Sequence, residues 1–407
     1  MVVLSHPNGN QNVRGALRGL LNKNLLSHFI TTVGFGNDCY FVQYMPNTIR
    51  RELSRRIYPI PGNLIKTDPL CECIRLLATR CKWNSLTRHQ ASIFSVDSIY
   101  LRHDQTTAEY IKHMVNLESV YAYEGGARLT FREAKKKGTK CIYELPTGYW
   151  KAGRDIFLEE ALRTPEWAPT LTGLKDSDEK LARKDEEISE ADIVLVASSF
   201  TLSTLKYSPI RTRHVNIIPY GAPALGPVKN INRNKPLRLI FVGSLRQQKG
   251  LSYLFDTVDL LGSSVTLTLI GMPSGDRCKI LEDRLKQHRY ITTLPHSEVL
   301  REMQQHDIFI FPSLFEGFGL VLLEAMAQGL PIITTTNTGA PDIIKDGCEG
   351  FITPIRSPQV MADKIQKLIS DRNLLEEMSL AARKKAGQLT WEQYGRNICA
   401  AIQENNI

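Results

Sequence analysis

The feature that most constrains the fold is a regular alternation of short apolar runs with amphipathic segments, which begins near residue 237. Apolar, β-branched runs predict strands that are buried on both faces, and the amphipathic segments between them predict helices. This alternation is typical of βα units that build a parallel, doubly wound sheet. We expect strands at Leu237–Gly243, Val265–Gly271, Tyr290–Leu294, Asp307–Pro312, Pro331–Thr335 and Gly350–Pro354.

The first half carries a similar but less regular series. The residues between Ala222 and Pro236 show no periodicity and predict an interdomain linker. The fold class is therefore α/β, with two Rossmann-like doubly wound domains that face each other across a cleft. We expect an N-terminal domain at 1–222, a linker at 223–236, a C-terminal domain at 237–388, and a last helix at 389–407 that returns to the N-terminal domain. Expected strands of the first half are Val2–Ser5, Phe29–Val33, Ser119–Tyr123, Lys140–Leu145, Asp192–Ala197 and His214–Pro219, with helices at Phe131–Lys137 and Asp178–Ala191.

Charge is distributed unevenly along the chain. The sequence has 51 Lys+Arg and 42 Asp+Glu. Residues 1–150 hold 20 basic and 11 acidic residues, whereas residues 151–407 hold 31 of each, so the whole excess lies in the first third. Arg50, Arg51, Arg55 and Arg56 fall within seven residues, which suits an anionic ligand, a membrane surface or an ordinary solvated helix face. Nucleic acid is disfavoured because no aromatic-basic motif accompanies them.

Neither a secretory signal nor a membrane span is indicated by the sequence. No run of about 18 uncharged apolar residues occurs, and Met1–Ser5 is too short for a signal-peptide core. We therefore expect a cytoplasmic protein. The eight cysteines lack a paired C-x-x-C spacing, so free thiols are expected and no metal site. Asp176-Ser177-Asp178 has a D-x-D form, but it opens an acidic helix-forming stretch and is expected to be a solvated helix start.

The strongest motif follows the expected strand that ends at Pro312. A loop containing Glu316 leads into a helix that begins near Leu320 and ends at Gly329. Backbone amides near Phe318, Gly319 and Leu320 can hold a phosphate, because a helix N-terminus combines free donors with the positive end of the helix dipole. Glu316 and Glu324 can reach different parts of one ligand, although both could simply favour the helix N-terminus.

A second motif follows the first strand of the C-terminal domain. Gly243 ends that strand, and Arg246 and Lys249 come within the next six residues. A glycine at a strand end lets a ligand approach the backbone, and the two cations can neutralise phosphate oxygens. Solvated basic residues are also common at such turns.

Together the two motifs resemble the retaining, nucleotide-sugar-dependent glycosyltransferases of family 4, which adopt the GT-B fold. The resemblance is close across residues 237–395 and includes an E-x7-E pair, Glu316 and Glu324. It also includes Leu269-Ile270-Gly271, Gly339-Ala340-Pro341-Asp342, and Thr390-Trp391. In the first half it is looser, with matches at the Asn8-Gly9-Asn10 loop, at Ser198-Ser199, and at Ile218-Pro219-Tyr220-Gly221.

The resemblance implies a role for each candidate site residue of the second domain. Glu324 would bind the donor ribose, and Glu316 would contact the transferred sugar and support the reacting centre electrostatically. Arg246, Lys249 and the loop at Gly243 would bind the diphosphate, with the amides of Phe318, Gly319 and Leu320 on its distal phosphate. No cofactor or metal is expected, since cations and helix amides can stabilise the leaving diphosphate.

Two positions depart from the family pattern. Ser244 stands where the family often has a basic residue, and Arg246 is the candidate to replace it. Many members place a histidine near the acceptor, and Glu144 occupies that neighbourhood here. Asn8, Gly9, Asn10 and Glu144 are therefore the acceptor-side candidates.

The resulting hypothesis is a metal-independent retaining hexosyltransferase in polysaccharide or glycoconjugate biosynthesis. Its acceptor would be a glycan or a lipid-linked sugar, which could place it at the inner face of an anionic membrane. Two alternatives stay open: a non-catalytic nucleotide-sugar-binding regulator with the same cleft, and a GT-B epimerase or phosphorylase.

Overall fold

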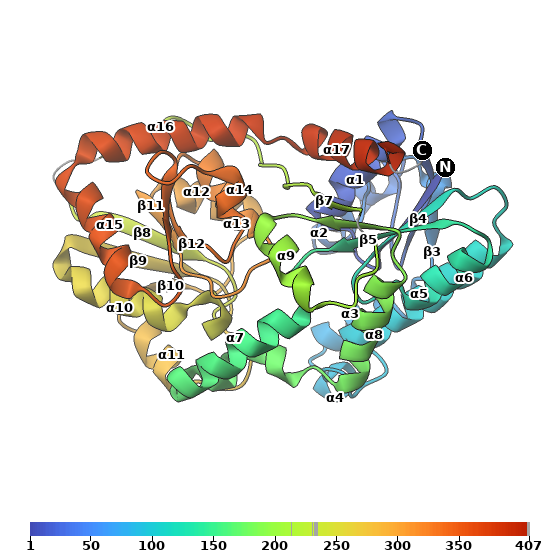
Figure 1. Ribbon diagram of the computed structural model, residues 1–407, viewed down its shortest axis with the longest axis horizontal. Helices are drawn as coiled ribbons and strands as arrows, with labels where there is room; N and C mark the ends of the chain where they lie inside the picture. The colour runs from blue at the N-terminus through green and yellow to red at the C-terminus, as the bar shows by residue number, and fades with distance from the viewer. Residues whose placement is uncertain (213, 230, 232–234, 405–407) are drawn as a thin grey trace.

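Two parallel β-sheets organise the chain, as the computed structural model shows for residues 1–212, 214–229, 231 and 235–404 (Figure 1). The first sheet has seven strands in the order β3-β2-β1-β4-β5-β6-β7, and the second has six in the order β10-β9-β8-β11-β12-β13. The strands of the first are β1 (Val2–Ser5), β2 (Leu26–Thr31), β3 (Ile65–Thr67), β4 (Ser119–Tyr123), β5 (Lys140–Leu145), β6 (Ile193–Val196) and β7 (Val215–Ile217). Those of the second are β8 (Leu237–Val242), β9 (Val265–Ile270), β10 (Arg289–Ile291), β11 (Ile308–Phe311), β12 (Ile332–Thr335) and β13 (Gly350–Thr353).

Helices cover both faces of each sheet. In the second sheet α10 packs with α15 on one face, while α12 and α13 lie on the other (Figure 1). The helices are α1 (Gln11–Asn22), α2 (Asn47–Ser54), α3 (Leu70–Arg80), α4 (Asn84–Thr87), α5 (Val96–His113), α6 (Arg128–Lys136), α7 (Trp150–Arg163), α8 (Asp178–Ser189), α9 (Ser199–Thr204), α10 (Leu251–Leu261), α11 (Lys279–Leu285), α12 (His296–Gln304), α13 (Leu320–Ala327), α14 (Ala340–Ile343), α15 (Pro358–Ser370), α16 (Arg372–Gln388) and α17 (Trp391–Glu404). The expected α/β class with two doubly wound sheets is confirmed.

The strand order places a switch point in each sheet. β1 pairs with both β2 and β4, and β8 pairs with both β9 and β11. Ligands of doubly wound sheets bind beyond the carboxyl ends of the strands at such points. The loops that follow β1, β8 and β11 are the three that carry the motifs of the sequence, so the topology brings the motifs of each sheet to one edge.

The first sheet differs from expectation at one side. The expected strand at Phe29–Val33 is β2, which begins three residues earlier and includes the polar Ser27 and His28. The sequence pattern did not indicate β3, which has three partly buried residues with Lys66 in the middle. Such a short edge strand has no apolar run by which it could be recognised.

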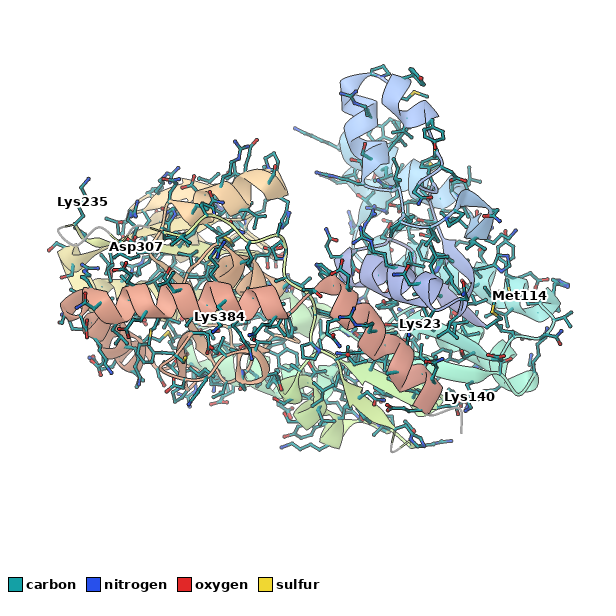
Figure 2. All side chains as sticks on the ribbon, turned by 90° about the horizontal axis from the view of Figure 1, so that it is seen from above. Lys23, Met114, Lys140, Lys235, Asp307 and Lys384 are labelled. Atoms are coloured by element: carbon teal, nitrogen blue, oxygen red, sulfur yellow. The ribbon has the colours of Figure 1, made fainter. Side chains whose placement is uncertain are left out.

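Each sheet with its helices forms a lobe: the first lobe is built on the seven-stranded sheet and the second on the six-stranded sheet. The C-terminal helices cross from the second lobe to the first (Figures 1 and 2). α16 packs on α13, whereas α17 packs on α1 of the first lobe. The contact with α1 is close, because a Cβ atom on Gly19 would lie 2.5 Å from the carbonyl oxygen of Gly395. Thr390 caps α17 by accepting a hydrogen bond from the Gln393 amide (3.1 Å).

A second connection runs the other way, because α7 of the first lobe lies against the second lobe (Figure 1). Its Glu160 is fully buried and accepts hydrogen bonds from Gln247 Nε2 (2.7 Å) and Arg356 Nε (2.8 Å). Trp167, just after α7, stacks on Phe255 of α10 with 6.0 Å between ring centroids. The segment after β5 therefore forms one wall of the region between the lobes.

Candidate functional site

Glycines allow the loops after β8, β9 and β11 to pack backbone against backbone. A Cβ on Gly271 would lie 1.8 Å from the carbonyl oxygen of Gly243, so these two strand ends meet backbone to backbone. Gly250 has a φ of +70°, and a Cβ there would lie 2.0 Å from the carbonyl oxygen of Pro312. The loop that carries Arg246 and Lys249 is thus fixed directly beside the loop that carries Glu316.

The helix N-terminus lies where the sequence predicts it. α13 begins at Leu320, and Gly319 before it has a φ of +85°. The side chain of Phe318 is buried against Gly339 and Tyr220, with 5.1 Å between the Phe318 and Tyr220 ring centroids. Only backbone groups of Phe318 are therefore suited to a ligand. The Leu322 amide already donates to the Gly319 carbonyl (2.9 Å), so the free first-turn donors of α13 are the amides of Leu320 and Val321.

Lys249 and Glu316 form an ion pair between the two loops. Lys249 Nζ contacts Glu316 Oε2 and lies 5.2 Å from the centroid of the Phe311 ring. Both side chains are largely buried, with 10% of Lys249 and 17% of Glu316 exposed. Burial, with a smaller effect of the nearby Arg246, lowers the pKa of the Lys249 ammonium to about 7. The pair places one cation and one carboxylate beside the amides of α13.

Glu324 holds a histidine that the sequence analysis did not single out. Its Oε1 lies 2.8 Å from Nε2 of His296, and this hydrogen bond raises the pKa of His296. His296 begins α12, in the segment that follows the third strand of the domain. Its position just beyond a strand end was the available signal. The Glu324 side chain remains 22% exposed.

Arg246 is hydrogen-bonded to the first lobe. Its Nη1 donates to Thr172 Oγ1 (3.1 Å), in the segment after α7. Its Nε is buried and has no hydrogen-bond partner within the part of the chain that the structure describes. Burial lowers the pKa of its guanidinium. The side chain lines a cavity of about 190 Å³ between the lobes, together with Gln248 and Phe315.

The acceptor-side loop after β1 is built around Tyr58. The Gly9 amide donates to Tyr58 Oη (2.9 Å), and a Cβ at Gly9 would lie 2.0 Å from the ring. Asn10 caps α1 by accepting from the Val13 amide (3.1 Å). The Asn8 amide donates to His6 Nδ1 (3.0 Å). Asn8, Gly9 and Asn10 follow the end of β1, as expected, and these hydrogen bonds stabilise the loop itself.

Glu144 is not on an open surface. It is 3% exposed, and its carboxylate accepts hydrogen bonds from Tyr121, from Asn12 (3.0 Å) and from Tyr220 (3.1 Å). Tyr394 of α17 lies 3.4 Å from the same carboxylate. Burial raises the pKa of Glu144, and the hydrogen bonds oppose that rise. The acceptor role implied by resemblance stays a prediction, whereas these contacts tie β5, α1, the linker and α17 together.

Contacts across the cleft join the β11 loop to the first lobe. The Gly317 carbonyl accepts hydrogen bonds from Ser198 and from Thr201 Oγ1 (2.9 Å), and a Cβ on Gly317 would lie 2.5 Å from Thr147 Cα. Asp342 accepts from the Ser199 amide (2.8 Å). The two lobes therefore meet directly beside Glu316.

Metal ligands do not gather at this site. In the ranges that the structure describes, no group of three or more His, Cys, Asp or Glu residues is placed to hold a metal ion. Ser177 caps α8 by accepting from the Lys180 amide, and Asp178 is fully exposed, so the D-x-D sequence is a helix start.

Comparison with known proteins finds similarity to glycosyltransferases that centres on the second lobe. Residues 227–385 match the family model described as glycosyl transferases group 1. The capsular polysaccharide biosynthesis glycosyltransferase CapM of Staphylococcus aureus is 32% identical over 164 residues, which are 38% of this chain and 43% of CapM. The D-inositol 3-phosphate glycosyltransferase of Corynebacterium diphtheriae is 26% identical over 289 residues, 60% of this chain and 66% of that protein. The chain thus matches less than two thirds of the length of these relatives.

Solved structures match over nearly the whole chain. HepE of Anabaena in complex with UDP and glucose has a TM-score of 0.65 at 15% identity, covering 99% of both chains. Sucrose-phosphate synthase of Thermosynechococcus elongatus has a TM-score of 0.67 at 14% identity, covering 99% of this chain and 98% of that one. The chain therefore has the GT-B fold, and residues 227–385 of its second lobe are similar to the glycosyl transferases group 1 family.

Proposed function

We propose that this chain is a retaining glycosyltransferase that moves a sugar from a nucleotide diphosphate sugar to a glycan or lipid-linked acceptor in polysaccharide biosynthesis. The observation that carries the proposal is the Lys249–Glu316 pair beside the N-terminus of α13, with Glu324 on the same helix. CapM and the amylovoran biosynthesis glycosyltransferase AmsK of Erwinia amylovora, which is 30% identical over 172 residues, support the polysaccharide context. HepE in complex with UDP and glucose supports a nucleotide-sugar donor.

The chemistry follows from charge placement. Amides at the start of α13 and the Lys249 ammonium would neutralise the diphosphate as its bond to the sugar breaks. Glu316 would hold sugar hydroxyls and stabilise positive charge on the sugar carbon, and Glu324 would bind the ribose in place of His296. The departing diphosphate would accept the acceptor's proton on the same face of the sugar, which gives retention. Cations and amides would serve in place of a metal ion.

Donor binding is the first test. In a thermal-shift panel of UDP-, GDP-, ADP- and dTDP-sugars we expect one donor to raise the melting temperature, because a ligand that binds only the folded state stabilises it. Glu324→Ala should weaken that donor about tenfold or more, the value of a charge-assisted hydrogen bond. Glu298→Ala removes a carboxylate of the neighbouring α12 and should leave the affinity unchanged. Donor affinity within twofold in Glu324→Ala would refute the assigned role.

Turnover separates an enzyme from a binding regulator. The stabilising donor should lose its sugar to water or to an added acceptor, with release of nucleoside diphosphate. A donor that binds and stays intact with every acceptor tried would instead favour a non-catalytic regulator. The anomeric configuration of the product, read by NMR, tests retention.

We also propose peripheral attachment to an anionic membrane through the region around α2. Tyr40 and Tyr44 are 72% and 82% exposed there, beside the exposed Arg50 and Arg55. Arg56 is largely buried against Glu72, and the side chain of Arg51 lies outside the described residues. No helix in the described part of the chain is long and apolar enough to span a bilayer.

Vesicle binding tests this attachment. Neutralising Arg50, Arg51, Arg55 and Arg56 should abolish sedimentation with phosphatidylserine-containing vesicles, since each exposed cation contributes about 1 kcal/mol near such a surface. The matched control neutralises four exposed cations of the second lobe and should still bind; these are Arg277, Lys286, Arg289 and Arg301. Equal binding of both variants would contradict the proposal.

A further inference from the structure

The cavity of about 190 Å³ between the lobes has an unusual lining. Three basic side chains line it: Arg154 of α7, Lys184 of α8 and Arg246 of the β8 loop. Lys184 lies 3.3 Å from Glu124, whereas Arg154 lies 4.0 Å from Asp178, whose side chain is fully exposed. Arg246 has the neutral Thr172 as its hydrogen-bond partner, and its Nε is buried without one among the described residues. The positive charge of the lining is therefore only partly neutralised.

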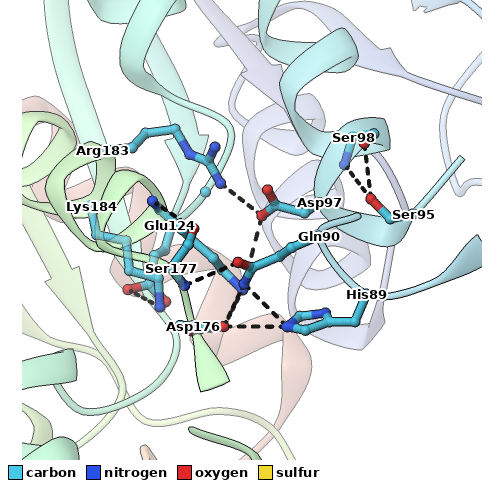
Figure 3. A network of polar contacts seen from close by, with 12 residues as sticks. His89, Gln90, Ser95, Asp97, Ser98, Glu124, Asp176, Ser177, Arg183 and Lys184 are labelled. Atoms are coloured by element: carbon cyan, nitrogen blue, oxygen red, sulfur yellow. Dashed lines mark hydrogen bonds and ion pairs between the residues drawn. The ribbon is translucent and has the colours of Figure 1, made fainter. Parts of the chain in front are cut away.

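One carboxylate also lines the cavity, and its charge is already balanced. Asp176 accepts from Lys180 Nζ (2.8 Å) and from Gln90 Nε2 (2.9 Å), and His89 lies 3.5 Å away (Figure 3). These contacts belong to the network that joins the loop before α5 to the start of α8, where the Ser177 amide donates to Gln90 Oε1 (Figure 3). Asp176 therefore leaves the charge of Arg154 and Arg246 available to a ligand.

The cavity adjoins the proposed reacting centre. Gln248, which lines it, precedes Lys249 and donates from Nε2 to the Phe315 carbonyl (2.9 Å), just before Glu316. Thr147, on the opposite wall, meets Gly317. The rings of Trp150 and Phe315 supply apolar surface that suits the C–H face of a sugar ring.

We propose that this cavity receives the anionic group, a carboxylate or a phosphate, of the sugar that accepts the transferred residue. The proposal rests on the proposed transferase function and names its acceptor class. The volume is below the roughly 300–1,000 Å³ of pockets that enclose whole drug-sized ligands, so it fits a charged substituent and part of one ring. Arg246 thereby binds the acceptor's anion instead of the donor diphosphate that the sequence indicates for it.

Competition between charged and neutral sugars tests the proposal. Glucuronate, glucose 6-phosphate and glucose are titrated by ligand-observed NMR into the full chain, saturated with the nucleoside diphosphate that stabilises it most. We expect at least one anionic sugar to bind about tenfold or more tightly than glucose, as charge-assisted hydrogen bonds provide. The tighter of the two anionic sugars identifies a carboxylate or a phosphate as the preferred group.

Two variants of α7 locate the effect. Arg154→Gln should reduce the preference for the anionic sugar over glucose about tenfold, whereas Arg163→Gln, which removes the same charge from an exposed Arg163–Glu159 pair, should not. Equal affinity for charged and neutral sugars, or equal effects of both variants, would overturn the inference. Nucleotide affinity and melting temperature are measured in parallel. If the unchanged chain bound no nucleotide, the proposed transferase function would be refuted. If it bound nucleotide but showed no preference for anionic sugars, only the proposed anionic acceptor would be refuted.

Discussion

Replacing Lys249 by glutamine is expected to slow sugar transfer about 100- to 1,000-fold, the usual effect of removing one group that stabilises a developing anion. Lys249 Nζ contacts Glu316 beside the N-terminus of α13, where the leaving diphosphate would gain charge. Because the Lys249 side chain is largely buried, solvent water cannot stabilise the diphosphate in its place once the ammonium is removed. The measurement is the rate of nucleoside diphosphate release with saturating donor and acceptor.

Loss of activity could also follow from a destabilised loop, because Lys249→Gln leaves Glu316 buried without its cation. The double variant Lys249→Gln/Glu316→Gln removes both charges and should recover most of the lost melting temperature. It should not recover turnover. Lys286→Gln, on the exposed end of α11, serves as the charge control. Turnover of Lys249→Gln within tenfold of the unchanged chain would exclude the proposed role.

Much of the second lobe could be predicted because its strands are buried on both faces. The runs at β8, β9 and β11 are rich in Val, Ile, Leu and Phe, interrupted only by Arg238 in β8 and by Thr266 and Thr268 in β9, and a glycine or proline follows each run. The apolar run of β11 and the glycines after it also predicted that Glu316 lies just before α13 and Glu324 within it. The short edge strand β3 carries no such run, and its pairing with β2 is set by the fold.

Contacts between distant segments could not be predicted. Arg246 follows a strand end and therefore indicated a phosphate ligand, yet its position depends on where the segment after α7 lies. That segment contributes Thr172 through a contact across 74 residues. The partner of Glu324 is likewise set by packing, since His296 belongs to the preceding helix. Periodicity within one segment carries no information about such pairs.

Glu144 illustrates the same limit more sharply. The family resemblance implies an acceptor-side role for it, because many members of the family place a histidine near the acceptor in that neighbourhood. The contacts of its side chain could not be predicted: it lies among Tyr121, Tyr220 and Tyr394, and the last of these belongs to α17. Those tyrosines lie 23, 76 and 250 residues away in the chain.

Removing this carboxylate should therefore destabilise the chain. Glu144→Ala leaves the buried hydroxyls of Tyr121 and Tyr220 and the Asn12 amide without their acceptor. Each such group costs about 1–3 kcal/mol, and because the neighbours can relax we expect the free energy of unfolding to fall by about 3–5 kcal/mol. Urea unfolding followed by circular dichroism measures it.

Glu144→Gln and Tyr394→Phe separate the contributions within this cluster. The glutamine keeps one acceptor oxygen and should cost less than the alanine, and Tyr394→Phe should cost about 1 kcal/mol or less, because its hydroxyl makes the longest contact, 3.4 Å. Proteolysis within α17 should quicken in Glu144→Ala, since Tyr394 connects that helix to the carboxylate. Donor affinity should change little in the folded chain, because the hydrogen bonds of Glu144 go to Asn12, Tyr121, Tyr220 and Tyr394 and not to Lys249 or Glu324. A Glu144→Ala chain with unchanged stability and a raised KM for acceptor would instead place Glu144 in the acceptor site.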